Sequence, residues 1–455
     1  MSRHEPFAFR SSEELLAKAA QLGIELPFQE DLSPLFEGIS LGSKKLPNRF
    51  AVQPMEGYDA HPDGSPGDLT FRRYRRFARG GSSLIWFEAT SVVPEGRSNP
   101  RQLWLHRQNV DSFARLVDEA REEAYRSFRP GHDIYCVLQL THSGRYSKPE
   151  GYPEPHVALY NPVLDKDREN IHILSDRELD LLEENFVDAA FLAHQAGFDA
   201  VDIKACHGYV VNELLAGFSR QDSEYGGSFS NRIRFLRDVT KKIRKEIPLT
   251  GIAIRMNAYD GIPFPYGFGS SKDEPDKIDL EEPKKAVSYL SEDGCSLLNI
   301  TAGIPSLFPH MGRPFDRHLP GAPVPPEHPM EGVSRLLSLT AAFQMDFPGL
   351  PIVGTGYSWL RQYFPYVGAA VLRNKKASFI GMGRSAFAYP DAPLDMMEKG
   401  KLNHRKVCIA CSRCTEMMRM GGEVGCVMKD KEIYGEKFKI LRREGKKHEK
   451  KHHRD

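Results

Sequence analysis

The sequence lacks an apolar run long enough to cross a membrane. A membrane-spanning helix needs about 20 consecutive apolar residues, and the 455 residues contain no such run. The first residues, 1–5, also lack the apolar segment of a secretory signal peptide. We therefore expect a cytoplasmic protein without a membrane partner.

An excess of charge of one sign is also absent. The chain has 62 basic and 61 acidic residues, a formal net charge of +1. Proteins that bind nucleic acid or acidic membrane surfaces usually carry a marked basic excess. Neither kind of partner is expected here.

Cysteine is scarce, with seven residues in all, and they fall into two sets. Cys136, Cys206 and Cys295 are isolated in or just after apolar runs, which predicts buried thiols. The remaining four are Cys408, Cys411, Cys414 and Cys426. In a cytoplasmic chain, clustered cysteines indicate a metal or cluster site in preference to disulfides.

From Asn48 the sequence alternates between short apolar runs and amphipathic stretches. Strands are expected at residues 50–53, 84–88, 134–139, 200–203, 250–256, 297–301, 352–354 and 379–384. Eight strand–helix units predict an α/β fold, a (β/α)8 TIM barrel; an open, doubly wound sheet is the structural alternative. The chain is long enough for a large barrel with additions.

Several connecting segments have recognisable signals. Ser175 and Glu178 form a capping box that opens a long helix ending near Ala196. Residues 11–22 predict a short N-terminal helix with a serine cap and no chemistry. The Gly- and Pro-rich segments 261–279 and 305–329 each follow a strand, so we expect both to cover a site at the carboxyl ends of the strands.

Three reactive side chains follow the fourth strand. Lys204, His207 and Tyr209 bring a cation, an imidazole and a phenol to one strand end. Such a trio can hold a carbonyl oxygen, stabilise charge on it and donate a proton. Taken alone, the same residues also fit two surface side chains and a core tyrosine.

The residues after this strand extend the pattern. Residues 204–209, 212–215, 220–228 and 231–235 together closely resemble the Old Yellow Enzyme family of flavin oxidoreductases, and the resemblance covers roughly residues 40 to 400. It implies that Tyr209 is the proton donor and that Lys204 and His207 anchor the substrate. It also implies FMN contacts at Gln53, Pro54, Met55, Glu56, Ala89, Gln139, Arg255, Gly383 and Arg384.

The residue types suit a flavin. The pyrimidine edge of the ring needs amide groups, and a nearby cation stabilises the reduced anion, tasks that Gln139 and Arg255 can perform. The phosphate needs backbone N–H groups and a cation at the last two strands. The candidates for it are Gly354, Gly356, Gly383 and Arg384.

Two positions depart from the family pattern. Lys204 stands where many members carry histidine, and a lysine has no acceptor, so the site should prefer an oxyanion or a polarised carbonyl. Glu56 stands where a small or weakly polar residue is usual. A carboxylate close to the flavin would oppose negative charge on the reduced ring, unless its side chain points away.

The cysteine cluster has the spacing of an iron–sulfur site. Three cysteines are separated by two-residue gaps, and the fourth, Cys426, is remote. This pattern is typical of a [4Fe-4S] cluster, with a structural zinc ion as the alternative. Its place after the eighth unit resembles the branch of the family that contains 2,4-dienoyl-CoA reductase, enoate reductase and trimethylamine dehydrogenase, in which the cluster relays electrons.

The sequence thus predicts four segments: an N-terminal extension (1–40), an FMN-binding barrel (41–400), a [4Fe-4S] module (401–430) and a basic, disordered tail (431–455). The predicted activity is reduction of an activated C=C bond in a small enone or enoate. Because no second nucleotide-binding half fits after the module, we expect NAD(P)H or an external electron-transfer protein as the electron donor. The alternatives are an amine or ether dehydrogenase and a non-catalytic redox-sensing or electron-transfer subunit. The sequence predicts neither the substrate nor the oligomeric state.

Overall fold

Eight parallel strands form a closed barrel in the computed structural model, which describes residues 3–127, 132–168 and 170–452, with side chains up to residue 444. The strands follow one another around the barrel in chain order, and the last pairs with the first. They are β3 (Phe50–Val52), β4 (Leu84–Ser91), β5 (Tyr135–Thr141), β8 (Ala200–Ala205), β9 (Gly251–Tyr259), β10 (Leu297–Ala302), β11 (Ile352–Gly354) and β12 (Phe379–Met382). The predicted (β/α)8 barrel is confirmed.

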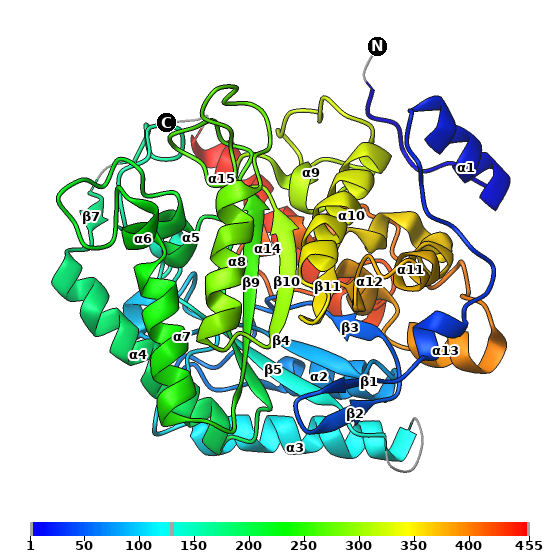
Figure 1. Cartoon of the computed structure of the whole chain (residues 1–455). Helices are drawn as coiled ribbons and strands as arrows, with labels where there is room; N and C mark the ends of the chain where they lie inside the picture. Colours follow the sequence, from blue (N-terminus) through cyan, green and yellow to red (C-terminus); the bar gives the residue numbers. More distant parts are fainter. Residues whose placement is uncertain (1–2, 128–131, 169, 453–455) are drawn as a thin grey trace.

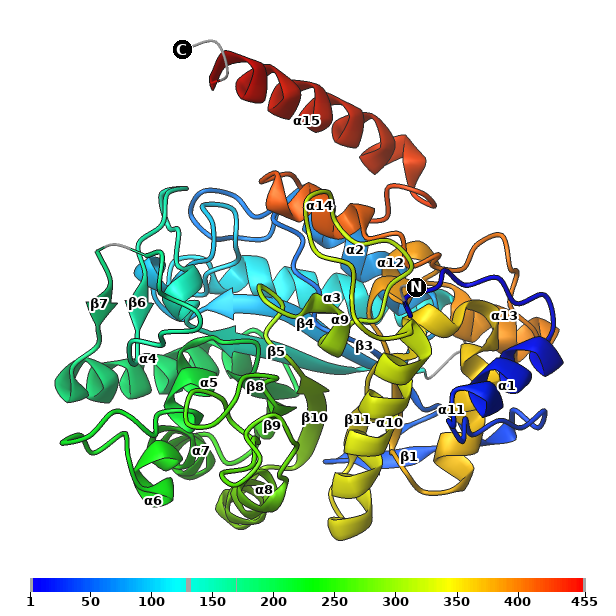
Figure 2. The same ribbon diagram turned by 90° about the horizontal axis from the view of Figure 1, so that it is seen from above.

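Helices surround the barrel, as Figures 1 and 2 show. The major ones after successive strands are α2 (Asp68–Arg79), α3 (Val110–Ser127), α4 (Asp176–Gln195), α7 (Arg234–Glu246), α8 (Glu281–Asp293), α10 (Pro329–Asp346), α11 (Phe364–Arg373) and α13 (Ala392–Lys399). Shorter helices are α5 (Val210–Leu215), α6 (Phe229–Arg232), α9 (Pro309–Gly312) and α12 (Arg384–Ala388), and 3-10 turns are η1 (Ser33–Phe36), η2 (Pro94–Gly96), η3 (Gly144–Tyr146) and η4 (Tyr357–Tyr363). The predicted capping box is present, since Ser175 and Glu178 bond each other's backbone at the start of α4. None of the helices in the described ranges is long and apolar enough to span a membrane.

A two-stranded hairpin packs against the apolar interior at the amino-terminal end of the barrel. It consists of β1 (Ile39–Leu41) and β2 (Lys44–Leu46), and its Leu41 and Leu46 belong to the buried cluster that fills the barrel. The predicted boundary between residues 40 and 41 therefore falls inside one structural unit. A second small pair, β6 (His156–Val157) and β7 (His172–Ile173), lies in the connection between β5 and α4. The N-terminal helix α1 (Ser12–Gln21) begins at the predicted serine cap, Ser11.

The segment after the barrel is more ordered than the sequence indicated. It contains α14 (Arg413–Arg419) and α15 (Lys431–His452), so a helix occupies most of the stretch predicted as a disordered tail. Tyr434 and Phe438, one helical turn apart, are buried against Met417 and Val427. This contact anchors the first part of α15, and Figure 2 shows the rest of the helix projecting from the body of the molecule. Because the stretch is rich in charged residues, its composition alone did not indicate that these two aromatic side chains are buried.

Candidate active site

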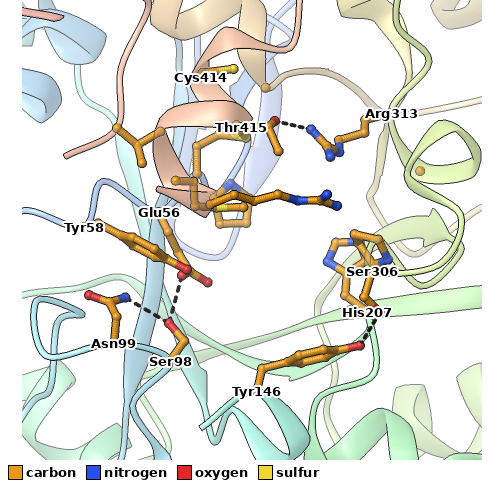
Figure 3. A pocket seen from close by; sticks show the side chains of 18 of the residues that line it. Glu56, Tyr58, Ser98, Asn99, Tyr146, His207, Ser306, Arg313, Cys414 and Thr415 are labelled. Atoms are coloured by element: carbon orange, nitrogen blue, oxygen red, sulfur yellow. Dashed lines mark hydrogen bonds between the residues drawn. The ribbon is translucent and has the colours of Figure 1, made fainter. Parts of the chain in front are cut away.

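A large cavity, about 1110 Å³ in volume, opens at the carboxyl ends of the barrel strands. Its size slightly exceeds the roughly 300–1,000 Å³ of a typical small-molecule site. Figure 3 shows Glu56, Tyr58 and Ser98 on one side of the cavity and His207 and Arg313 on the opposite side. The cavity lies where barrel enzymes carry their chemistry.

The residues that the sequence predicted largely meet in this cavity. Among the predicted residues, those that line it are Gln53, Pro54, Met55, Glu56, Gln139, Lys204, His207, Tyr209, Arg255, Gly356, Gly383 and Arg384. Ala89 and Gly354 are not among its lining residues. Ala89 is buried at the end of β4 and its carbonyl accepts from Gln102, while the carbonyl of Gly354 faces the amide of Gln53 at 3.4 Å.

A left-handed turn presents the predicted catalytic trio. Lys204 is the second-last residue of β8, and His207 and Gly208 then adopt positive φ values of 67° and 77°. The amide of Gly208 donates to Asn212 at 2.7 Å, which fixes the turn before α5 begins. Because of this reversal, His207 and Tyr209 face the same cavity as Lys204.

The ammonium of Lys204 has two neighbours. Its Nζ lies 3.5 Å from Oε1 of Glu56 and 3.4 Å from the centre of the Tyr209 ring. The hydroxyl of Tyr209 donates to the same Oε1 at 3.3 Å. The side chain of Glu56, whose direction the sequence left open, is thus directed at Lys204 and Tyr209.

The three groups have perturbed pKa values, each chiefly because of burial. Desolvation, followed by the charge of Glu56, holds the pKa of Tyr209 well above its ordinary value, so the phenol keeps its proton. Desolvation and the nearby cations, Arg255 first, hold the pKa of His207 well below its ordinary value, so the imidazole is neutral. Desolvation also lowers the pKa of Lys204, while Glu56 opposes that shift.

The polar groups on the cavity floor fit the ring of a flavin. Gln139 donates to Oδ2 of the buried Asp202 at 2.6 Å, which fixes its amide beside the cavity. The guanidinium of Arg255 has no hydrogen-bond or ion-pair partner in the described structure, and its buried Nε is unsatisfied. Burial lowers the pKa of Arg255, while Cys206 and Asp202 oppose that shift without pairing with the guanidinium directly. An electron-rich ring edge that becomes negative on reduction would give the guanidinium a direct partner.

Two further arginines suit a phosphate. Arg384 begins α12 directly after β12; its Nη2 donates to the carbonyl of Pro314 at 2.5 Å, and its buried Nη1 has no partner among the described residues. Arg313 donates to the hydroxyl of Thr415, and desolvation together with Arg384 lowers the pKa of Arg313 to about 10. Neither arginine has a carboxylate partner in the part of the chain that is described. Two guanidinium groups that lack a carboxylate partner among the described residues favour a bound anion such as a phosphate.

Several lining residues were not predicted as site residues. They lie in the connections after the strands and are Tyr58, Ser98, Tyr146, Ser306 and Arg313. The hydroxyl of Tyr146, in η3, lies 2.8 Å from that of Ser306. Arg313 lies in segment 305–329, which the sequence predicted to cover the site, and that segment does line the cavity. The other predicted cover, 261–279, contributes none of the lining residues. Its Phe264 and Tyr266 instead contact Phe218 and Asn161 outside the cavity.

The four clustered cysteines line a second, smaller cavity beside the first. Cys408 and Cys411 come from the loop before α14, Cys414 from the first turn of α14, and Cys426 from the segment before α15. Ala410 and Ser412 take left-handed φ values of 48° and 57° in this loop, and the amide of Ala410 donates to Sγ of Cys408 at 3.4 Å.

No three His, Cys, Asp or Glu side chains in the described ranges are arranged to hold a single metal ion. Burial raises the pKa of the Cys408 thiol to about 11 and that of Cys426 to about 12. The isolated Cys136, Cys206 and Cys295 are buried free thiols, as predicted.

Comparison with known proteins agrees with this geometry. The model of a family described as NADH:flavin oxidoreductase / NADH oxidase matches residues 34–268. An NADPH dehydrogenase of Clostridium acetobutylicum is 31% identical over 230 residues, which are 50% of this chain and 64% of that protein. The chain thus spans somewhat less than two thirds of the length of this relative.

Solved structures share the fold. A 2-naphthoyl-CoA reductase in complex with 2-naphthoyl-CoA superposes with a TM-score of 0.71 at 19% identity, over 88% of this chain and 57% of that one. Histamine dehydrogenase from Rhizobium sp. 4-9 superposes with a TM-score of 0.67 at 21% identity, over 88% of this chain and 52% of that one. At such identities the likeness shows a common barrel fold.

Proposed function

Because the chain belongs to the NADH:flavin oxidoreductase / NADH oxidase family, we propose that it is an FMN-dependent NAD(P)H oxidoreductase that reduces a C=C bond conjugated to a carbonyl. One observation carries the proposal. Tyr209, with its proton retained, shares a cavity with Lys204, His207 and the unpaired cation of Arg255. A proton donor, carbonyl-binding groups and a flavin-compatible floor are what this reaction needs.

The side chains divide the work as follows. Lys204 and the neutral His207 bind the carbonyl oxygen of the substrate and stabilise the negative charge that develops on it. When bound, FMN supplies the hydride for the β-carbon. Tyr209 gives its hydroxyl proton to the α-carbon, and its raised pKa keeps that proton available until the carbon becomes basic.

The charge of the cavity favours this function over amine oxidation. Its lining includes eight basic side chains, Arg101, Lys148, Arg168, Lys204, Arg255, Arg313, Arg384 and Arg419. The acidic lining residue is Glu56, which Lys204 already contacts. A cationic amine would be repelled, whereas an electron-rich carbonyl compound or an anionic group such as the acyl-CoA named for one structural neighbour would be attracted.

The alternative is a dehydrogenase that oxidises an amine and passes electrons outward. The fold neighbour histamine dehydrogenase and the three tyrosines at the cavity, Tyr58, Tyr146 and Tyr209, support it, since aromatic faces bind ammonium groups. However, the ammonium of Lys204 already lies over the ring of Tyr209, so this aromatic face is not free to bind a substrate amine.

We further propose that the cysteine cavity holds a [4Fe-4S] cluster that relays electrons to or from FMN. The four thiols face one cavity, a backbone N–H donates to one sulfur, and Arg384 lines both cavities. Three closely spaced cysteines with a fourth more remote are the ligand pattern of a cubane. An external electron-transfer protein is then a candidate partner.

One anaerobic experiment tests the main proposal. The flavin is first reduced, and its reoxidation is followed while an enone, an enoate, an α,β-unsaturated thioester and an amine are offered in turn. We expect reoxidation by at least one of the three unsaturated carbonyl compounds. Reduction of oxidised flavin by the amine, with no reoxidation by any carbonyl compound, would establish the dehydrogenase instead.

A further inference from the structure

Glu56 contacts two of the three proposed catalytic side chains, Lys204 and Tyr209. Its Oε1 lies 3.5 Å from Nζ of Lys204 and accepts from the hydroxyl of Tyr209 at 3.3 Å, and its Oε2 accepts from Ser98 at 3.3 Å. The Glu56 side chain is 13% exposed and that of Lys204 is 5% exposed. In such a shielded place a charge pair is weakly screened by water.

The other charged groups near Lys204 are otherwise engaged. Asp202 is bound by Gln139, Trp86 and the amide of Arg255. Cys206 keeps its proton, because burial raises its pKa to about 11. Arg255 is a second cation, and the flavin that its position fits would compensate it.

The groups that face Glu56 add no second positive charge. They are Lys204, Tyr209, Ser98 and Tyr58, and desolvation raises the pKa of Tyr58, so this phenol stays neutral. One carboxylate therefore offsets one ammonium at the place where the substrate oxygen binds.

We propose that Glu56 determines substrate specificity: by cancelling the charge of Lys204, it makes the anchoring site select a neutral carbonyl group over a carboxylate. The inference rests on the proposed function insofar as Lys204 faces the substrate. A neutral carbonyl still receives a hydrogen bond from Lys204. A carboxylate placed there meets the negative charge of Glu56, which removes the attraction that an isolated lysine would provide.

The test uses benzamide and benzoate, two ligands of nearly equal shape that differ in charge and contain no reducible alkene. Their dissociation constants are measured on the oxidised holoenzyme by titration of flavin absorbance or by calorimetry. Glu56→Gln should raise the affinity for benzoate relative to benzamide about tenfold or more, because the charge of Lys204 is then uncompensated. Lys204→Gln should lower the affinity for benzoate relative to benzamide by about the same factor, because the negative charge of Glu56 is then uncompensated. Two variants with opposite expected effects therefore test the proposal.

One control isolates the charge. Glu423→Gln removes a carboxylate that pairs with Lys437 and lies 3.9 Å from Arg101, another basic lining residue, and it should leave the ratio within about threefold.

The outcomes separate this inference from the proposed function. A ratio unchanged by Glu56→Gln, an equal shift in Glu423→Gln, or a wild type that binds neither ligand would overturn the inference. Since no turnover is measured, a shifted ratio in a protein that reduces no unsaturated carbonyl would uphold the role of Glu56 and refute the ene-reductase proposal alone.

Discussion

The guanidinium of Arg313 donates a hydrogen bond to the hydroxyl of Thr415, the residue that follows Cys414. Arg313 belongs to a barrel loop, whereas Thr415 lies in α14 of the cysteine-rich segment. Cys414 and Arg384 each line both cavities, so the two sites share a wall. If the cysteine cavity holds a cluster, this wall is the direct route for electrons between cluster and flavin.

The first prediction concerns the cofactors. Protein purified anaerobically should contain FMN and about four irons per chain. Cys411→Ser should lose the iron and retain FMN, because Gln139, Arg255 and Arg384 belong to the barrel. Metal analysis and flavin absorbance measure both quantities, and Cys295→Ala, a buried thiol outside the module, should keep both. Stoichiometric zinc without iron would refute the relay.

The second prediction separates binding from proton transfer. Tyr209→Phe should slow reoxidation of reduced flavin by an enone roughly 10²- to 10⁴-fold, the contribution of a positioned acid, and should leave flavin reduction by NAD(P)H intact. Lys204→Ala should weaken enone binding and slow the same step together, since the charge develops on the oxygen that Lys204 holds. Stopped-flow traces of each half-reaction give these rates. Loss of flavin reduction by an amine in Tyr209→Phe, with normal enone turnover, would contradict the assignment.

The third prediction concerns pH. The pKa of His207 is lowered and that of Tyr209 is raised, so neither should titrate between about pH 6 and pH 9, and the rate of flavin reoxidation should be flat over most of this range. The pKa of Lys204 is lowered by desolvation, so its ammonium loses its charge at a lower pH than an ordinary lysine does. As pH rises through that pKa the ammonium disappears, and the rate should fall. Lys204→Gln should lack this alkaline fall, whereas a bell-shaped profile centred near neutrality would contradict the assignment of charge states.

The fourth prediction concerns α15. Phe438 is 5% exposed and packs with Met417, Val427 and Tyr434. Phe438→Ala should release the helix, because truncating a buried phenylalanine costs up to about 3–5 kcal/mol. Limited trypsin digestion should then remove the C-terminal residues faster while FMN content is unchanged. Ile440→Ala, at a neighbouring position that is 46% exposed and is not a trypsin site, should digest at the wild-type rate.

The sequence determined the barrel because its signals are local. Each strand is a short apolar run followed by an amphipathic helix, and the parallel closure brings all strand ends to one side. For that reason Lys204, Tyr209, Gln139 and Arg255 meet in one cavity, as the sequence predicted. The resemblance to the flavin oxidoreductases is confirmed by the match over residues 34–268.

Only the tertiary structure decided what these groups face. Glu56 and Lys204 are 148 positions apart, and nothing in either local pattern indicates that the carboxylate points at the lysine. The helix at 431–452 likewise depends on two aromatic side chains that meet Met417 and Val427. Side-chain direction is set by contacts between distant segments, so periodicity and composition, which describe neighbours in the chain, do not contain it.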